Sequence, residues 1–392
     1  MNRLMRICYC LAFALVCLPS FAQQQLLDED QLRDGWLQLF DGETLYGWQT
    51  TSDADWAVVD GAIQVKSGQP GFLMTTSQFA DYDLHVEFRA AADTNSGVFL
   101  RTPLKPANPA TDCYELNIAP TSNPFPTGSF VGRAKASVTN GKSKEWHTFD
   151  IRAEGGKFTV KLDGKSVLEY VDESPIASGH IALQLNQGEV SFRNIRLKPL
   201  GTKPIFNGEN LDGWNTNLAE ASKFDVTDAG ELRVVNGKGQ LESNGRYGDF
   251  LLQLECMTNG DQLNSGVFFR CIPGELMNGY ECQIHNGIQD GDPTKPVDGG
   301  TGGFYRRQPA RRVMARDHEW FAMTLLGDGP HFATWVNGVQ VTDWTDTRPP
   351  HNNPRNGLRL QPGTLCIQGH DPTTDLLFRD LRIVELPAES EN

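Results

Sequence analysis

The chain has 392 residues, with 49 Asp and Glu against 35 Lys and Arg, and a formal net charge of −14. A surface this acidic repels the phosphates of nucleic acids and the headgroups of anionic membranes, so neither is an expected partner. The length exceeds what one compact core usually holds, and about two domains are expected.

Residues 1–22 have the pattern of a secretory signal peptide. Arg3 and Arg6 precede a short apolar run, and small residues lead to an expected cleavage after Ala22. The run is too short for a stable membrane span. Lipid attachment at Cys17 fits less well, because the two residues before it are bulky. We therefore expect a secreted or periplasmic protein without a membrane span.

The cysteines do not form a disulfide scaffold. Three of the eight lie in the signal peptide, and an odd number at irregular spacing remains. Cys271 and Cys282 flank one loop and could pair in an oxidising compartment. Each also fits as a small buried residue, which is the interpretation we favour.

Six short segments recur in the same order in the two halves of the chain, which indicates a tandem duplication with its joint at 198–203. We expect a first domain over 33–200 and a second over 201–387. The repeated pairs are 39–48 and 205–214, 95–101 and 264–270, 114–115 and 280–281, 145–151 and 319–325, 163–164 and 337–338, and 192–197 and 378–383.

Each copy has the pattern of β-structure. Segments such as 84–88 and 158–162 alternate apolar and polar residues and end at Gly, Asp or Pro. Asp163-Gly164 and Asn337-Gly338 are typical of type I′ hairpin turns, which need positive φ at both central residues. No sustained helical period follows residue 35. We expect all-β domains, each an antiparallel sandwich of the jelly-roll type.

One strand of the second copy gathers chemically active groups. In 280–285 the apolar residues alternate with Glu281, Gln283 and His285, so the period of two puts the polar side chains on one face. A solvated sheet face would give the same alternation. The combination of carboxylate, amide and imidazole, with Arg270 on a neighbouring strand, instead favours an acid/base or metal site.

The two copies differ at positions that matter for such a site. The second has Gln368 and His370 where the first has Gln184 and Asn186, and it has an imidazole at 285 where the first has Ala119. An imidazole can act as a base near neutral pH and a carboxamide cannot. We expect the second domain to be catalytic and the first to be a degenerate partner that binds glycan or supports the site.

A long insert, 286–317, distinguishes the second copy further. It is rich in Gly and Asp and then in Arg. Its glycines would let the backbone approach a ligand, and Tyr305, Arg306 and Arg311 could bind sugar hydroxyls or an anionic group. A surface loop with solvated arginines is the alternative. Loops of this length in compact domains are commonly functional, which favours the binding role.

The ordered set of segments resembles the 3-keto-disaccharide hydrolase family, a jelly roll similar to concanavalin A. The resemblance rests on Phe-Asp/Asn-Gly-x-x-Leu-x-Gly-Trp, Asn-Ser-Gly-Val-Phe-x-Arg, Tyr-Glu, Glu-Trp, the Asp/Asn-Gly hairpin and the closing Phe-Arg-Asn/Asp-Ile/Leu-Arg, each present twice. It implies two tandem concanavalin A-like jelly rolls and hydrolysis of glycosides already oxidised at C3 of the sugar.

The implied chemistry explains the choice of groups. A ketone at C3 acidifies the C2 proton, so a base can form an enolate, the C1 leaving group departs, and water adds back. This needs a base, an electrophile at the C3 oxygen and a proton for the leaving oxygen. The expected catalytic residues are Glu281, His370 and His285, and the expected substrate-binding residues are Arg270, Gln283, Gln368, Tyr305, Arg306 and Arg311.

A divalent cation could supply the electrophile. Glu281 and His370 are the expected ligands, although the chain has no HExxH or paired Cys-x-x-Cys motif. A mixed nitrogen and oxygen site suits calcium less than manganese or zinc.

Other functions are compatible with the sequence. A jelly roll serves non-catalytic carbohydrate-binding proteins equally well, and a conventional glycosidase with two carboxylates is a third alternative. Both copies could also be active, with Glu115 as the base in the first. The sequence does not determine the oligomeric state.

Overall fold

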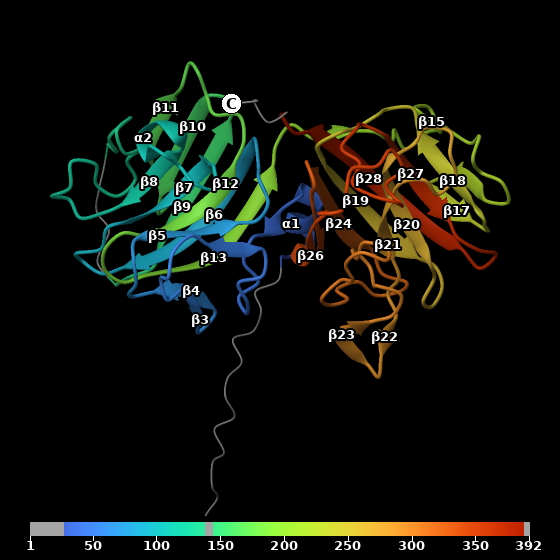
Figure 1. Cartoon of the computed structure of the whole chain (residues 1–392), viewed down its shortest axis with the longest axis horizontal. Coiled ribbons are helices and arrows are strands. Elements are labelled where there is room, and N and C mark those ends of the chain that lie inside the picture. The colour runs from blue at the N-terminus through green and yellow to red at the C-terminus, as the bar shows by residue number, and fades with distance from the viewer. Residues whose placement is uncertain (1–26, 138–143, 388–392) are drawn as a thin grey trace, which may run out of the picture.

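The computed structural model describes residues 27–137 and 144–387, which form two β-sandwiches side by side (Figure 1). The expected signal peptide, 1–22, lies outside the described residues. The helices are α1 (Glu29–Asp34) and α2 (Pro109–Asp112). No helix in the described ranges is long and apolar enough to cross a membrane.

The first sandwich packs an eight-stranded sheet against a five-stranded one. The larger sheet has the order β11 (Lys165–Val171), β10 (Lys157–Leu162), β9 (His147–Glu154), β6 (Tyr82–Ala90), β13 (Val190–Pro199), β4 (Ala62–Val65), β3 (Ala57–Val59), with β1 (Leu37–Gln38) beside β13. The smaller has the order β2 (Trp48–Thr50), β5 (Gly71–Thr75), β12 (His180–Leu185), β7 (Ser96–Thr102), β8 (Tyr114–Ile118).

The second sandwich repeats this topology. Its larger sheet has the order β16 (Lys223–Val226), β17 (Leu232–Val235), β28 (Asp375–Glu385), β19 (Phe250–Thr258), β24 (Phe321–Asp328), β25 (His331–Val336), β26 (Val339–Thr345), with β14 (Lys203–Pro204) beside β28. Its smaller sheet has the order β15 (Trp214–Asn215), β18 (Gly239–Ser243), β27 (Thr364–Gly369), β20 (Ser265–Cys271), β21 (Tyr280–Ile284). A hairpin of β22 (Ile288–Gln289) and β23 (Asp292–Pro296) has no counterpart among the strands described for the first sandwich, in 27–137 and 144–200.

The predicted jelly-roll fold and its alternation are confirmed. Every second side chain of β6 enters the core between the sheets, as the period of two requires. The two predicted hairpin turns also form, since Asp163 and Asn337 have φ of 51° and 49° and a glycine with positive φ follows each.

The two sandwiches share buried contacts. The backbone N–H of Gln38 donates to Gly338 O at 2.8 Å, and the Trp335 indole donates to Gln38 O at 3.1 Å. Trp335 is 1% exposed and belongs to the apolar core of the first sandwich, although it comes from β25 of the second. The second sandwich therefore contributes a side chain to the core of the first.

Candidate functional site

The candidate site lies on the outer face of the second sandwich's five-stranded sheet, away from the core. The apolar residues of β21 enter the core, and Glu281, Gln283 and His285 occupy the opposite face, as predicted. Two rows of residues cross this face from strand to strand. In one row Glu242 pairs with Cys366, Cys366 with Phe268, and Phe268 with Glu281. In the adjacent row Gln240 pairs with Gln368, and Gly266 pairs with Gln283.

Glu281 is the charged centre of this face. The residue is 7% exposed, and its carboxylate accepts a hydrogen bond from Arg355 Nη2 at 3.0 Å. Burial raises the pKa of Glu281 above its ordinary value, and Arg355 offsets part of that rise. His370 lowers and Asp298 raises the pKa of Glu281 by smaller amounts.

Arg355 was not among the predicted site residues. It belongs to the connection 346–363 between β26 and β27, which is longer than the corresponding connection 172–179 of the first sandwich. The guanidinium also donates to Met277 O at 2.9 Å and lies over the Phe268 ring. The sequence carries a signal for this connection, because the second copy is longer than the first between its Asn-Gly turn and its closing strand. The prediction of site residues missed that signal.

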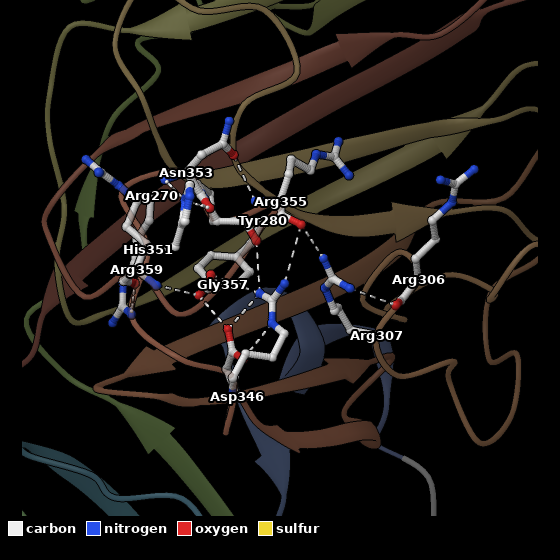
Figure 2. A network of polar contacts seen from close by, with 12 residues as sticks. Arg270, Tyr280, Arg306, Arg307, Asp346, His351, Asn353, Arg355, Gly357 and Arg359 are labelled. Carbon is white, nitrogen blue, oxygen red and sulfur yellow. Dashed lines mark hydrogen bonds and ion pairs between the residues drawn. The ribbon is translucent and has the colours of Figure 1, made fainter.

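A polar network holds this connection in place (Figure 2). Asp346 accepts from the Tyr280 hydroxyl and from Arg348, each at 2.8 Å. Arg307 donates to the backbone O of Arg355 at 2.8 Å. Because Tyr280 precedes Glu281 on β21, the network fixes Arg355 relative to the carboxylate that it meets.

Three amide side chains on this face each have a polar atom without a hydrogen-bond partner. Gln240 Nε2, Gln283 Oε1 and Gln368 Oε1 are buried without a hydrogen-bond partner. Unpaired buried polar atoms are costly unless something else satisfies them. Gly266 lies between the last two, and a Cβ there would come within 3.1 Å of Glu281 Cγ, so glycine keeps this space open.

His370 stands at the end of β27 with its ring oriented by a carboxylate. Its Nδ1 is 2.8 Å from Asp371 Oδ2, which leaves Nε2 available. Burial alone would raise the pKa of Asp371, but hydrogen bonds from Thr373 and His370 hold it below its ordinary value. An aspartate that stays ionised beside an imidazole is the usual support of a histidine base.

His285 is less suited to act as a base. It is 7% exposed, and its Nδ1 accepts from the Gly287 N–H at 3.2 Å. Burial lowers the pKa of His285, with Asp298 and Asp317 offsetting part of the effect. A buried neutral ring whose Nδ1 accepts carries its proton on Nε2 and can only donate there.

Asp298 and Asn264 join the site although neither was predicted. Asp298 Oδ2 accepts from Asn264 Nδ2 at 2.6 Å and from Gln283 Nε2 at 3.1 Å. These bonds fix the Gln283 amide through its nitrogen and leave its buried oxygen without a partner.

Arg270 does not belong to the site. It is fully buried and pairs with Asp249 at 2.7 Å, while its other donors bond to the backbone oxygens of Gly248, Gly329 and Arg359. All three guanidinium nitrogens are used inside the fold and the side chain is fully buried, so the predicted substrate contact is wrong. Its ion pair is with Asp249 and not with Glu281, although Glu281 lies on the neighbouring strand.

Arg311 binds the other sandwich. It donates to Asp41 Oδ2 at 2.7 Å and to Gln340 O at 2.9 Å, and it lies over the Tyr46 ring. The predicted sugar-binding role is wrong for this residue, because its donors are committed to the domain interface.

The remaining predicted loop residues lie beside the site. Tyr305 donates its backbone N–H to Glu281 O at 3.0 Å, and its ring lies beneath the Arg355 guanidinium. Arg306 is exposed and stacks on Tyr305. Both stay predictions as sugar contacts.

The insert is shorter than the sequence suggested. Phe304 bridges to Cys282 and Gln308, as Phe130 bridges to Leu116 and Ala134 in the first sandwich. The segment around Phe304 is therefore shared, and the β22–β23 hairpin is the added part. The glycines serve packing here: a Cβ at Gly302 would lie 2.6 Å from Val341 Cγ2.

The residues named for a metal ion do not form a ligand set. In 27–137 and 144–387 no group of three or more His, Cys, Asp or Glu side chains is placed to share an ion. The carboxylate of Glu281 is already paired with a guanidinium. The metal ion stays a prediction.

The cysteines of the described residues are all free and buried, which confirms the interpretation of Cys271 and Cys282 as small buried residues. Cys271 and Cys282 lie on adjacent strands with side chains on opposite faces of the sheet, since Cys271 packs with Phe268 and Cys282 with the main core.

Comparison with known proteins decides the family. The model of the 3-keto-alpha-glucoside-1,2-lyase-like domain matches residues 35–198 and again 201–384. The chain belongs to this family. Each half of the protein is therefore one copy of the 3-keto-alpha-glucoside-1,2-lyase-like domain.

Single relatives are more distant. A 3-keto-disaccharide hydrolase of Bacteroides thetaiotaomicron is 28% identical over 229 residues, which cover 43% of this chain and 79% of that protein. A solved candidate glycosyl hydrolase of Parabacteroides distasonis is 18% identical, with a TM-score of 0.40, over 46% of this chain and 100% of its own. The carbohydrate-binding module CBM66 of Bacillus subtilis is 19% identical, with a TM-score of 0.32, over 38% of this chain and 94% of its own.

Proposed function

We propose that the second sandwich cleaves glycosides that carry a ketone at C3, by elimination between C1 and C2 followed by addition of water. The observation that carries this proposal is that one sheet face holds a carboxyl paired with a guanidinium and amide atoms without partners, and that a carboxylate-oriented imidazole follows its strand β27. The family and its relative named as a 3-keto-disaccharide hydrolase support it.

His370 is the proposed base. Its Nε2 takes the C2 proton, and the electron pair of that C–H bond forms the enolate with the C3 carbonyl. Asp371 stabilises the imidazolium that results, because it remains a carboxylate.

Arg355 is the proposed electrophile. Enolate formation places negative charge on the C3 oxygen, and a guanidinium in a water-poor site stabilises such charge strongly. When the enolate collapses, the C1–O bond breaks with its electron pair on the leaving oxygen.

Glu281 is the proposed acid. Burial raises its pKa, so when Arg355 turns from Glu281 to the enolate oxygen the carboxyl takes up a proton more readily than an exposed one and can pass it to the leaving oxygen. Gln240, Gln283 and Gln368 supply the unpaired amide atoms that would position the sugar hydroxyls. Water then adds across the C1–C2 double bond and completes the hydrolysis.

The deciding experiment compares a 3-keto-disaccharide with its unoxidised parent. Cleavage of the keto sugar alone is expected. Cleavage of the parent would indicate a conventional glycosidase, and binding of either sugar without turnover would indicate a carbohydrate-binding protein.

Dialysis against a chelator tests whether Arg355 or a metal ion is the electrophile at the C3 oxygen. Turnover that survives dialysis against a chelator assigns the electrophile to Arg355. Turnover that is lost and then restored by Mn²⁺ or Zn²⁺ assigns it to a metal ion and contradicts the role of Arg355.

A further inference from the structure

The outer face of the first sandwich's five-stranded sheet keeps the layout of the candidate site but changes its chemistry. Met74 pairs with Ala182, Ala182 with Phe99, and Phe99 with Glu115; in the adjacent row Phe72 pairs with Gln184 and Gly97 with Asn117. Glu115 and Gly97 hold the places of Glu281 and Gly266. Phe72 and Met74 hold those of Gln240 and Glu242.

The polar atoms of this face are unpaired as well. Asn117 Oδ1 and Gln184 Oε1 are buried without a hydrogen-bond partner, and Asn117 is 2% exposed. The Asn117 amide nitrogen donates to Phe125 O, so the oxygen is the free end. These are the positions of Gln283 and Gln368, whose oxygens are unpaired in the second sandwich.

Among the described residues, Glu115 differs from Glu281 in having no cationic partner. The connection 172–179 is short and delivers no arginine to this face, and Arg133 pairs with Asp172 instead. Burial without a charge partner raises the pKa of Glu115 to about 7. Every side chain in the two rows is therefore neutral or acidic.

An aromatic ring completes the face. Phe72 is partly exposed and meets Phe99 edge to face, with ring centroids 4.7 Å apart. An accessible ring beside amide oxygens and a carboxyl matches a pyranose, which offers an apolar C–H face and a rim of hydroxyl donors.

We propose that the first sandwich binds a neutral, unoxidised saccharide on this face, with the sugar ring on Phe72 and its hydroxyls on Glu115, Asn117 and Gln184. The carboxyl and the absence of any cation in the rows select against anionic sugars. The site binds and does not cleave, because no imidazole corresponds to His370. It does not depend on the function proposed for the second sandwich.

The test measures binding of maltose and of cellobiose by calorimetry, in a full-length protein whose second site is disabled by Gln283→Ala and Gln368→Ala. At least one of the two sugars should bind, and glucuronate should not. Phe72→Ala and Gln184→Ala should each weaken binding about tenfold or more, which corresponds to about 1.4 kcal/mol. Glu169→Gln, an exposed carboxylate on β11, is the matched control and should change nothing.

A protein that melts normally and binds neither sugar would overturn the proposal, and so would binding that is unaffected by Phe72→Ala. Turnover of a keto sugar that Glu115→Gln abolishes and His370→Ala leaves intact would show that the first sandwich is catalytic and would contradict the binding-only role. Because the readout is binding, failure of the keto-sugar assay leaves this result unaffected.

Discussion

Glu115 and Glu281 occupy the same place in two copies of one fold, and their neighbours make them chemically different. Glu281 meets Arg355, whereas Glu115 has only buried surroundings. The residue type alone could be predicted from the repeat. The charge state could not, because it depends on a side chain 74 residues away in the chain.

Removing Arg355 should destabilise the protein through Glu281. Arg355→Ala leaves a buried carboxylate unpaired, which typically costs about 3 kcal/mol. Denaturant unfolding checks this value. The same change in a Glu281→Gln background should cost much less, and equal costs in both backgrounds would show that the pair does not exist. Arg306→Ala, an exposed arginine nearby, is the control.

Glu115 should make stability depend on pH in a defined direction. Its folded pKa of about 7 lies above the value of an unfolded glutamate, so the folded state binds the proton more tightly. Stability then falls as pH rises from about 4.5 through about 7. Glu115→Gln removes this loss and should stabilise the protein by about 1 to 3 kcal/mol at pH 8, with little effect at pH 4. Thermal melts at both pH values decide, and an equal shift at the two would contradict the prediction.

His370 should dominate turnover. Loss of a general base costs roughly 10²- to 10⁴-fold in rate, so His370→Ala should reduce kcat by this amount. Asp371→Asn should give a smaller loss, since the base is still present. His85→Ala removes the ring of a different His–Asp pair, on β6 of the first sandwich, and should leave kcat unchanged. Normal turnover of His370→Ala would remove the residue from the mechanism.

At the scale of elements, two connections distinguish the second sandwich from the first. The connection 346–363 carries Arg355 to the site, and the β22–β23 hairpin precedes Asp298. The sequence singled out the whole stretch 286–317 as functional and missed 346–363. Neither connection has a period, so pattern analysis could not say which loop folds over the sheet.

Changing Asp298 and deleting the β22–β23 hairpin should have different effects on KM. Asp298→Ala frees the Gln283 and Asn264 amides, and KM should rise about tenfold, the effect of losing a charge-assisted hydrogen bond. Replacing 289–295 by an Asn-Gly turn should leave KM and kcat unchanged. A KM that rises with the hairpin deletion alone would assign substrate binding to the hairpin.

At the scale of the whole molecule, the two sandwiches are joined by buried contacts rather than by the linker alone. Trp335 completes the core of the first, and Arg311 bridges β26 of the second to Asp41. Hydrogen bonds from Thr44, Glu43 and Arg311 hold the pKa of Asp41 below its ordinary value, although burial opposes them.

Breaking the ion pair between Arg311 and Asp41 should weaken the coupling between the two domains and leave turnover unchanged. Arg311→Ala should cost about 2 kcal/mol, because Asp41 keeps its other hydrogen bonds, and should turn one unfolding transition into two. Arg312→Ala, whose partner Glu43 is exposed, should cost less than about 1 kcal/mol. Calorimetry measures both. A loss of turnover in a folded Arg311→Ala protein would return this residue to the candidate site.

The sequence by itself determined the duplication, the all-β class, the hairpin turns and the face of β21 that carries Glu281, Gln283 and His285. These features follow from local periods and from motifs that recur, and a period of two fixes which way each side chain points. Only the tertiary structure decided which arginine meets which acid. Arg355 pairs with Glu281 across 74 residues, and Arg311 pairs with Asp41 across 270. Such partners are set by how aperiodic loops fold back over a sheet, because charge alone allows an arginine to pair with any carboxylate that it can reach.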